Sequence, residues 1–428
     1  MKDTFYIKTL GCKVNQYESQ VIRENFLLNG HSETGNIDEA EVCVVNTCTV
    51  TSTSDSKSLR LIRNALKRKD RCVVATGCMV EDKDLDLSRL KGVKFIIKNK
   101  DKYRIPYIIK GAPVKKTTSQ GVRQTCGITR FKDHTRVFVK IQDGCSNFCS
   151  YCKVRLARGD SRSRLAKEIL DECRRLIRNG SKEIVLTGIC LGAYGRDLTE
   201  RSDLSRLIAK ICEIDGEWRL RLSSIEPKDI NEDLIYQFQT QEKLCKHIHI
   251  PFQSGDDYIL KRMERPYTRK EYLSTVYRLK AAIQDIAIST DIMVGFPGER
   301  EEGFQNTVDF IKKVKPMRMH VFPFSRRKGT KAYSYRDEIN SDTKKQRSDR
   351  LLHIAGELSG QFVDKFMGRK VQVLVEDKRS RDGYLQGYTD RYIRLYIDGP
   401  DDYKGQLLKG KILQDDVNVF FLEKTGLP

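Results

Sequence analysis

The 428-residue sequence predicts an α/β protein composed of an open parallel sheet, a partial (β/α)6 barrel and a small antiparallel β-barrel. Three observations support this. Apolar strands alternate with helices in the first part of the chain, a strand–helix unit then recurs six times, and short alternating strands with Gly and Asp turns end the chain. This length suits two or three domains. We expect domains at 1–112, 131–361 and 362–428, with a polar linker at 113–130.

Hydrophobic periodicity defines the elements of the first domain. Val21, Ile22 and Phe26 recur at helical spacing, and Gly30 ends that helix. The runs between the helices are continuously apolar, which is typical of buried parallel strands. The expected strands are 4–10, 41–46, 71–77 and 93–99, and the expected helices are 15–30 and 54–70. Their alternation indicates an open sheet covered on both faces.

Six parallel strand–helix units form the second domain. Six units make a curved partial barrel rather than a closed eight-fold one, and the chemistry of such barrels lies at the C-terminal ends of the strands. The expected barrel strands are 137–142, 183–189, 218–224, 247–253, 288–296 and 319–325, and the strands expected in the last domain are 370–377, 383–390, 392–398 and 411–423.

Three cysteines follow the first barrel strand directly: Cys145, Cys149 and Cys152, spaced C-x3-C-x2-C. The N-terminus has no apolar signal segment and no stretch approaches the roughly 18 apolar residues of a membrane span, so we expect a cytoplasmic protein. In that reducing compartment, clustered thiols indicate metal binding or catalysis. A closed zinc site needs four ligands, whereas three thiols without a histidine favour an iron–sulfur cluster with one open iron.

A second set of three cysteines ends the first three strands of the N-terminal sheet: Cys12, Cys48 and Cys78. The carboxyl ends of parallel strands line one edge of a sheet, so these thiols should converge. The preceding glycines allow tight turns. We again expect a cluster with one open iron. The remaining cysteines are interpreted as small buried packing residues: Cys43, Cys72, Cys126, Cys173, Cys190, Cys212 and Cys245.

The formal net charge of +21 indicates an anionic partner, most often nucleic acid, although a basic proteome bias is an alternative. Several basic residues fall at the rim side of the barrel, where they could bind phosphates or form an ordinary solvated face. They are Arg155, Arg158, Arg162, Arg164, Arg326, Arg327 and Lys328. Tyr384, Tyr388 and Tyr392 could stack on bases or pack the last domain.

The two cysteine triplets occur together with the motifs "RLSSIEP", "HIHIPFQSG" and "TDIMVGFPGE". In this combination the sequence resembles the radical S-adenosylmethionine (SAM) methylthiotransferase family over essentially the whole chain. The resemblance implies an N-terminal methylthiotransferase domain, a TIM-like radical SAM core and a C-terminal TRAM domain.

Three branches of that family compete. The stretches "TLGCKVNQYES", "CSNFCSYC" and "FPFSRRKGT" resemble the branch that modifies N6-threonylcarbamoyladenosine (t6A) in tRNA. The alternatives are the branch acting on isopentenyl-adenosine in tRNA and the branch acting on an aspartate of a ribosomal protein. A non-enzymatic iron–sulfur RNA-binding protein would explain the charge and the cysteines but not the whole pattern.

The resemblance also implies the cofactors and partners. The cofactors would be two 4Fe–4S clusters, on Cys145, Cys149 and Cys152 and on the second triplet, together with SAM. Reductive cleavage of SAM would give a 5′-deoxyadenosyl radical for an unactivated C–H bond, and the second cluster would supply sulfur. The partners would be tRNA carrying t6A, an electron donor such as flavodoxin or ferredoxin, and a sulfur source, with no membrane and a monomeric protein.

Residues that close barrel strands are candidates for contacts to SAM, or are structural turns. They are Thr187, Gly188, Ser224, Glu226, Gln253, Ser254 and Asp291. The sequence departs from the family pattern in two places. Arg155 and Leu156 replace a Pro–aromatic pair after the first triplet, and "MVE" follows Cys78 in place of a "YAQ"-like stretch. The ligand cysteines are intact, and the geometry of substrate binding is the property these departures would change.

Overall fold

The computed structural model describes residues 4–84, 90–111, 127–132, 134–199, 202–414 and 420–424. Most of the linker expected at 113–130 lies outside the described residues. The chain divides into two compact units. The first comprises Met1–Ile128, Gln142–Arg162 and Ser325–Ser334, and the second comprises Thr129–Ile141, Ser163–Phe324 and Tyr335–Pro428. The C-x3-C-x2-C segment therefore belongs to the same compact unit as the N-terminal sheet.

The first unit contains a five-stranded parallel sheet in the order β2-β1-β3-β4-β5. Its strands are β1 (Thr4–Thr9), β2 (Ser32–Glu33), β3 (Val42–Thr47), β4 (Cys72–Gly77) and β5 (Phe95–Ile96). Its α-helices are α1 (Lys13–Leu28), α2 (Ser52–Ala65), α3 (Ile105–Ile108) and α4 (Val154–Arg158). The four strands expected from the sequence are confirmed, and β2 is an additional edge strand.

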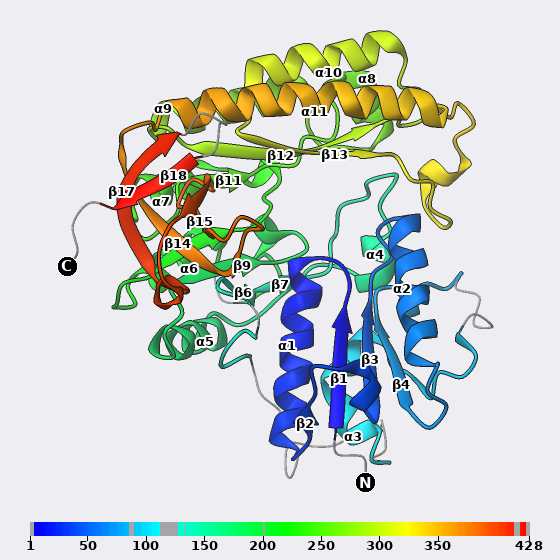
Figure 1. Ribbon diagram of the computed structural model, residues 1–428. Helices are drawn as coiled ribbons and strands as arrows, with labels where there is room; N and C mark the ends of the chain where they lie inside the picture. The colour runs from blue at the N-terminus through cyan, green and yellow to red at the C-terminus, as the bar shows by residue number, and fades with distance from the viewer. Residues whose placement is uncertain are drawn as a thin grey trace. The chain divides into compact units, whose positions relative to one another are not determined.

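Side chains that alternate along the strands fill two separate cores, one on each face of this sheet. On one face Val42 and Val44 pack with Ile22 and Phe26 of α1. On the other face Val45 packs with residues of α2, including Leu59 and Ile62. Figure 1 shows α1 and α2 on opposite sides of the strands. Burial on both faces explains why β3 and β4 are apolar without interruption.

The second unit contains the six predicted parallel strands, in two three-stranded sheets ordered β10-β9-β6 and β11-β12-β13. The strands are β6 (Val137–Lys140), β9 (Glu183–Thr187), β10 (Arg219–Leu222), β11 (His247–His249), β12 (Ala287–Val294) and β13 (Arg318–Pro323). Isolated parallel bridges, such as the one between Ser224 and His249, connect β10 to β11. The six strands therefore form two bridged parallel sheets, an arrangement compatible with the expected partial barrel.

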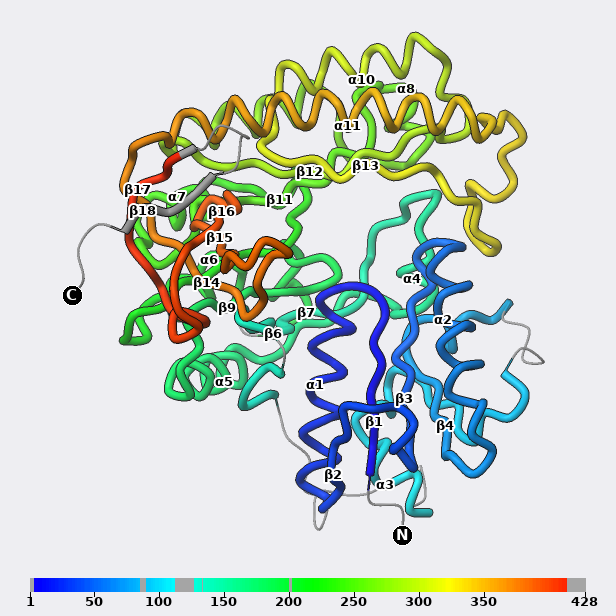
Figure 2. Tube along the Cα trace, viewed as in Figure 1, coloured from blue at the N-terminus to red at the C-terminus, as the bar shows by residue number. Residues whose placement is uncertain are grey.

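Helices follow the barrel strands as expected. They are α5 (Ala166–Arg178), α6 (Leu204–Cys212), α7 (Glu232–Thr240), α8 (Asp257–Arg262), α9 (Arg269–Ala282), α10 (Glu301–Val314) and α11 (Ser341–Asp364). The helix α11 runs beside β12 and β13 (Figure 2). No helix among the described residues is long and apolar enough to cross a membrane. The short strands β7 (Gln142–Asp143) and β8 (Arg162–Ser163) flank the cysteine segment.

The C-terminal strands close a small barrel in the order β14-β15-β16-β18-β17. They are β14 (Lys370–Arg379), β15 (Leu385–Thr389), β16 (Arg394–Ile397), β17 (Leu407–Gln414) and β18 (Phe420–Lys424). Four of the pairings are antiparallel as expected, but β16 and β18 pair in parallel. The single strand expected at 411–423 is two strands. These form a hairpin, so that β18 runs in the direction of β16 and closes the barrel.

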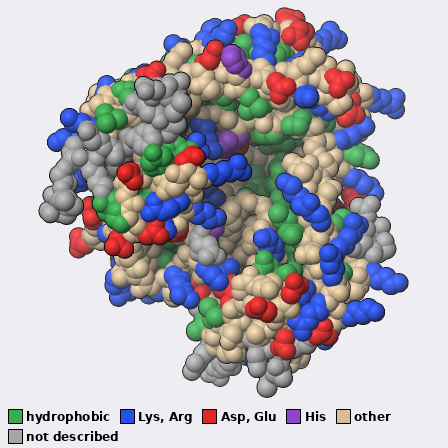
Figure 3. Space-filling model, viewed as in Figure 1, with side chains coloured by type: hydrophobic (Ala, Val, Ile, Leu, Met, Phe, Trp, Pro, Cys, Tyr) green, Lys and Arg blue, Asp and Glu red, His purple; other side chains and the backbone are tan. Residues whose placement is uncertain are grey.

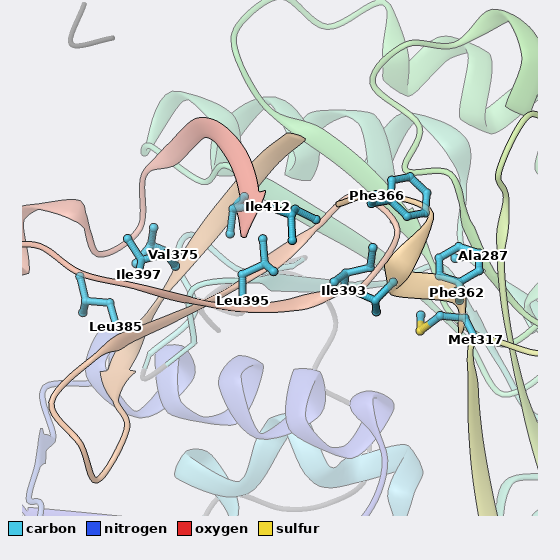
Figure 4. Packing of buried hydrophobic residues seen from close by; sticks show 12 residues of the cluster. Ala287, Met317, Phe362, Phe366, Val375, Leu385, Ile393, Leu395, Ile397 and Ile412 are labelled. Carbon is cyan, nitrogen blue, oxygen red and sulfur yellow. The ribbon is translucent and has the colours of Figure 1, made fainter. Parts of the chain in front are cut away.

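The core of this barrel extends onto neighbouring elements (Figure 4). Phe362 and Phe366, at and just after the end of α11, pack with Ile393 and Leu395 inside the barrel. The boundary expected between 361 and 362 thus falls within α11, because that helix supplies part of the C-terminal core.

Candidate cluster and cofactor sites

Cys12, Cys48 and Cys78 follow the adjacent strands β1, β3 and β4, and the structure brings them together at the carboxyl edge of the sheet. Gly11 has φ 107°, and a Cβ there would lie 3.1 Å from the sulfur of Cys48. Burial raises the pKa of Cys48, and the neighbouring Cys78 raises it further. Cys78 has its pKa raised by burial and by Cys12 as well. The three thiols thus lie near one another at the edge where the strand order predicts them.

The loops that carry these thiols are held by buried polar side chains. The side-chain nitrogen of Asn15 donates to the carbonyl of Leu10 at 2.7 Å and to that of Thr47 at 2.9 Å. Gly77 has φ 98°, and a Cβ there would lie 2.4 Å from the carbonyl oxygen of Thr47. The turn before Cys78 therefore excludes a side chain, which explains this glycine.

The donors at this edge fit an iron–sulfur cluster. The three strand ends contribute three cysteine sulfurs, and a four-iron cluster held by three thiolates would keep one iron open. A cluster is ligated by thiolates, so its assembly on these cysteines would release the protons of their thiols.

Cys145, Cys149 and Cys152 lie between β7 and α4 and are all half-buried. Backbone N–H groups point at two of the sulfurs: that of Asn147 lies 3.4 Å from Cys145 Sγ, and that of Val154 lies 3.4 Å from Cys152 Sγ. Backbone donors of this kind stabilise thiolates. Partial exposure leaves these thiols accessible to a small molecule, as a cluster with one open iron requires.

The candidate SAM residues lie in the second unit, mostly at the ends of barrel strands. Thr187 ends β9, with Gly188 next, and Ser224 and Glu226 follow β10. The carboxylate of Glu226 forms an ion pair with Arg265. Gln253 and Ser254 are buried beyond β11. Asp291 differs, because it lies inside β12 rather than past its end.

Asp291 joins two histidines that the sequence analysis did not single out. One carboxylate oxygen lies 3.2 Å from His249 Nε2, and the other lies 3.0 Å from His320 Nδ1. Burial alone would raise the pKa of Asp291, but the two imidazoles hold it well below its usual range. The hydroxyl of Ser289 contacts His247 at 2.9 Å and His249 at 2.8 Å. The alternation in "HIHIP" places His247 and His249 on one face of β11. Sequence reasoning missed this signal.

Two of the seven basic residues expected to bind RNA are buried instead. Arg158 is 4% exposed and Arg327 is 6% exposed. The guanidinium of Arg327 donates to the carbonyl of Thr49 at 3.0 Å and to the carboxylate of Asp55 at 2.5 Å. A buried guanidinium with protein partners cannot reach a phosphate, so these two assignments are wrong.

The other basic candidates differ in their exposure. Arg162, Arg326 and Lys328 are exposed. Arg164 is half-buried and donates to the buried Glu172 at 2.7 Å, and Arg155 lies 3.8 Å from the ring centroid of Phe148. Figure 3 shows Lys and Arg side chains spread over the face drawn, with acidic side chains among them.

The tyrosines of the last domain are mainly packing residues. Tyr392 stacks on His247 at 4.9 Å, and the guanidinium of Arg136 lies 4.8 Å from the ring of Tyr388. Tyr384 lies beside Tyr396, with the ring centroids 6.5 Å apart.

Replacing Arg327 with glutamine should lower the free energy of unfolding by about 2 kcal/mol, since it removes charged hydrogen bonds from a buried site. The neighbouring Arg326→Gln is the matched control: it should leave stability unchanged and weaken tRNA binding. Urea unfolding and filter binding distinguish the two. Equal loss of tRNA affinity in both variants at unchanged stability would contradict the burial argument.

Comparison with known proteins agrees with this geometry. The radical SAM superfamily matches residues 139–311, and a family described as Uncharacterized protein family UPF0004 matches residues 4–98. A threonylcarbamoyladenosine tRNA methylthiotransferase, MtaB, of Bacillus subtilis (strain 168) is 34% identical over 96% of this chain and 94% of its own length. The chain belongs to the radical SAM methylthiotransferase family. Each of the two matched regions contains one of the cysteine triplets, as the resemblance implied.

This methylthiotransferase has other relatives of similar identity. MtaB of Thermotoga maritima is 36% identical over 91% of this chain and 90% of its own length. A tRNA-2-methylthio-N(6)-dimethylallyladenosine synthase of Acetivibrio thermocellus is 35% identical over 91% and 84%. The protein is a tRNA methylthiotransferase, with two 4Fe–4S clusters and SAM as cofactors.

A solved structure shares the fold of this methylthiotransferase. The radical SAM methyltransferase TsrM of Kitasatospora setae, with cobalamin and a 4Fe–4S cluster bound, gives a TM-score of 0.56 over 76% of each chain at 14% identity. At that identity the likeness concerns the fold alone, and it extends beyond the barrel.

Proposed function

We propose that this protein converts t6A, next to the 3′ side of the tRNA anticodon, to its 2-methylthio derivative. The observation that carries the proposal is the presence of two separate three-thiol sites in one compact unit. One site would serve the cleavage of SAM, and the other would serve the delivery of sulfur. An iron–sulfur electron carrier would not explain the six-stranded barrel or the basic excess, and a plain RNA-binding protein would not explain the two cysteine triplets.

Cys145, Cys149 and Cys152 would hold the cluster that binds SAM, and Cys12, Cys48 and Cys78 would hold the second. When bound, SAM and its cluster supply a radical that removes a hydrogen atom from an aromatic carbon, which no side-chain base can deprotonate near neutral pH. Thr187, Gly188, Ser224, Glu226, Gln253, Ser254 and Asp291 are the candidate SAM contacts. All of these except Asp291 lie near the carboxyl ends of parallel strands, which supports this role.

The choice of t6A rests on the motif around Cys12 and on the relatives named MtaB. The dimethylallyladenosine branch is the second candidate, because a relative with that name is equally similar.

Arg162, Arg326 and Lys328 would contact tRNA phosphates. The protein would work in the cytoplasm as a monomer, with an electron donor such as flavodoxin or ferredoxin and with a separate sulfur source.

The test is expression in a bacterium that lacks its own methylthiotransferases, followed by mass spectrometry of the nucleosides from its tRNA. We expect the 2-methylthio derivative of t6A. The corresponding derivative of isopentenyl-adenosine would keep the reaction and overturn the substrate. If both clusters are present and no thiomethylated nucleoside is found, the tRNA assignment itself is wrong.

A further inference from the structure

Arg158 lies in a buried network beside the second cysteine triplet. Its Nε donates to the sulfur of Cys78 at 3.3 Å. Its other nitrogens donate to the side-chain oxygen of Asn15, to both carboxylate oxygens of Glu18 at 3.0 Å and to Asp143 at 2.9 Å. The side chain is 1% exposed. All the donor positions of the guanidinium are thus directed at groups within the first unit.

The charges around this guanidinium explain how it can be buried. Glu18 is also buried and accepts from the ammonium of Lys102 at 2.6 Å. Two cations, Arg158 and Lys102, therefore face two carboxylates, Glu18 and Asp143. Burial of a guanidinium is strongly unfavourable unless it is paired in this way. The carboxylates satisfy its charge, and the contact to sulfur is additional.

The network also joins two segments that are distant in sequence. Arg158 is the last residue of α4, the helix that comes after Cys152 in the chain. Cys78 instead follows β4 of the N-terminal sheet. The segment that carries one set of thiols thus supplies a hydrogen-bond donor to the other set. A purely structural ion pair would require only Glu18 and Asp143, and it would not require Nε to point at a sulfur.

We propose that Arg158 is a positioning residue that raises the reduction potential of the cluster on Cys12, Cys48 and Cys78 through its N–H···S bond to Cys78. The proposal rests on the cluster assignment made under the proposed function. A hydrogen bond to a ligating thiolate withdraws electron density from the sulfur and stabilises the reduced form. If a sulfide held at this cluster bonds to a carbon radical of the substrate, its lone pair and the unpaired electron supply three electrons. Two of these would form the C–S bond and the third would reduce the cluster by one electron, a transfer that a higher potential favours.

The experiment is a redox titration of the enzyme with both clusters loaded, followed by electron paramagnetic resonance with and without SAM. The signal that SAM does not alter belongs to the second cluster. Arg158→Lys keeps the charge but loses the multidentate guanidinium, so we expect its midpoint potential to shift to more negative values. Arg155→Gln, on the same helix but directed at Phe148 and Asp160, should leave the potential unchanged. A loaded Arg158→Lys variant with the wild-type potential would overturn the proposal.

A second measurement needs no variant. In wild-type protein labelled with ¹⁵N-arginine, electron–nuclear double resonance on the SAM-insensitive signal should show a hyperfine coupling to arginine nitrogen. Its absence would overturn the proposal even if the lysine variant failed to fold. Neither readout uses the modification of tRNA, so a failure of the proposed substrate would appear in the nucleoside assay and leave these results intact.

Discussion

Replacing Cys78 with alanine should remove one of the two clusters, so that the purified protein loses about half of its iron. Cys78 is buried next to Cys12 and Cys48, and only two ligands would remain. Methylthiolation of tRNA should fall below detection, whereas reductive cleavage of SAM should persist, because Cys145, Cys149 and Cys152 are unchanged. Iron analysis and chromatographic detection of 5′-deoxyadenosine measure the two effects.

The matched control is Cys43→Ala. Cys43 is fully buried in β3, in the same sheet, but it lies five residues before Cys48, away from the carboxyl edge. It packs with Ile62 and Val73 in an apolar core, so its replacement should leave the iron content and activity at wild-type levels. A Cys78 variant with full iron, or a Cys43 variant that loses a cluster, would refute the assignment.

The cysteine convergence was predictable because it depends on topology alone. Apolar strands alternating with helices imply parallel order, and parallel order places the residues that follow neighbouring strands at one edge. The six barrel strands were predictable for the same reason. The parallel pairing of β16 with β18 was not, because periodicity shows that strands exist but not which strands pair.

The roles of the arginines could not be predicted from the sequence. Arg158 lies in a basic stretch that resembles a phosphate-binding surface, and its partner Glu18 is 140 residues away. Burial of a charged side chain depends on such distant partners, which local sequence does not reveal. The link between Asp291 and His320, 29 residues apart, was missed for the same reason.

A second set of buried charges joins the radical SAM barrel to the C-terminal barrel. Glu183, at the start of β9, is fully buried and accepts from Arg219 at 2.5 Å and from Arg221 at 2.7 Å. These two guanidinium groups also donate to carbonyl oxygens of the C-terminal barrel: Tyr388 at 2.7 Å, Thr389 at 3.0 Å and Asp390 at 2.8 Å. The carboxylate of Glu183 therefore orients both arginines toward the C-terminal barrel.

Replacing Glu183 with glutamine should cost about 3–5 kcal/mol of stability, because it leaves two buried guanidinium groups without their counter-charge. The C-terminal barrel should loosen first, since its contacts depend on the orientation of these arginines. Limited proteolysis should then cut the chain between α11 and β14 faster than in the wild type, and urea should unfold the variant at a lower concentration. Glu217→Gln is the control: Glu217 is 61% exposed and 3.9 Å from Lys182, so its loss should change stability little.

The same network predicts the pH dependence of stability. Burial alone would raise the pKa of Glu183, but Arg221 and Arg219 outweigh it and hold the pKa well below the ordinary value of 4.5. A carboxyl with a depressed folded pKa contributes its full stabilisation above the unfolded value and loses it as the pH falls through the folded one. The stability difference between wild type and Glu183→Gln should therefore be constant at neutral pH and diminish only below about pH 4.5. A difference that already narrows between pH 8 and 6 would mean that Glu183 is not the ionised partner of these arginines.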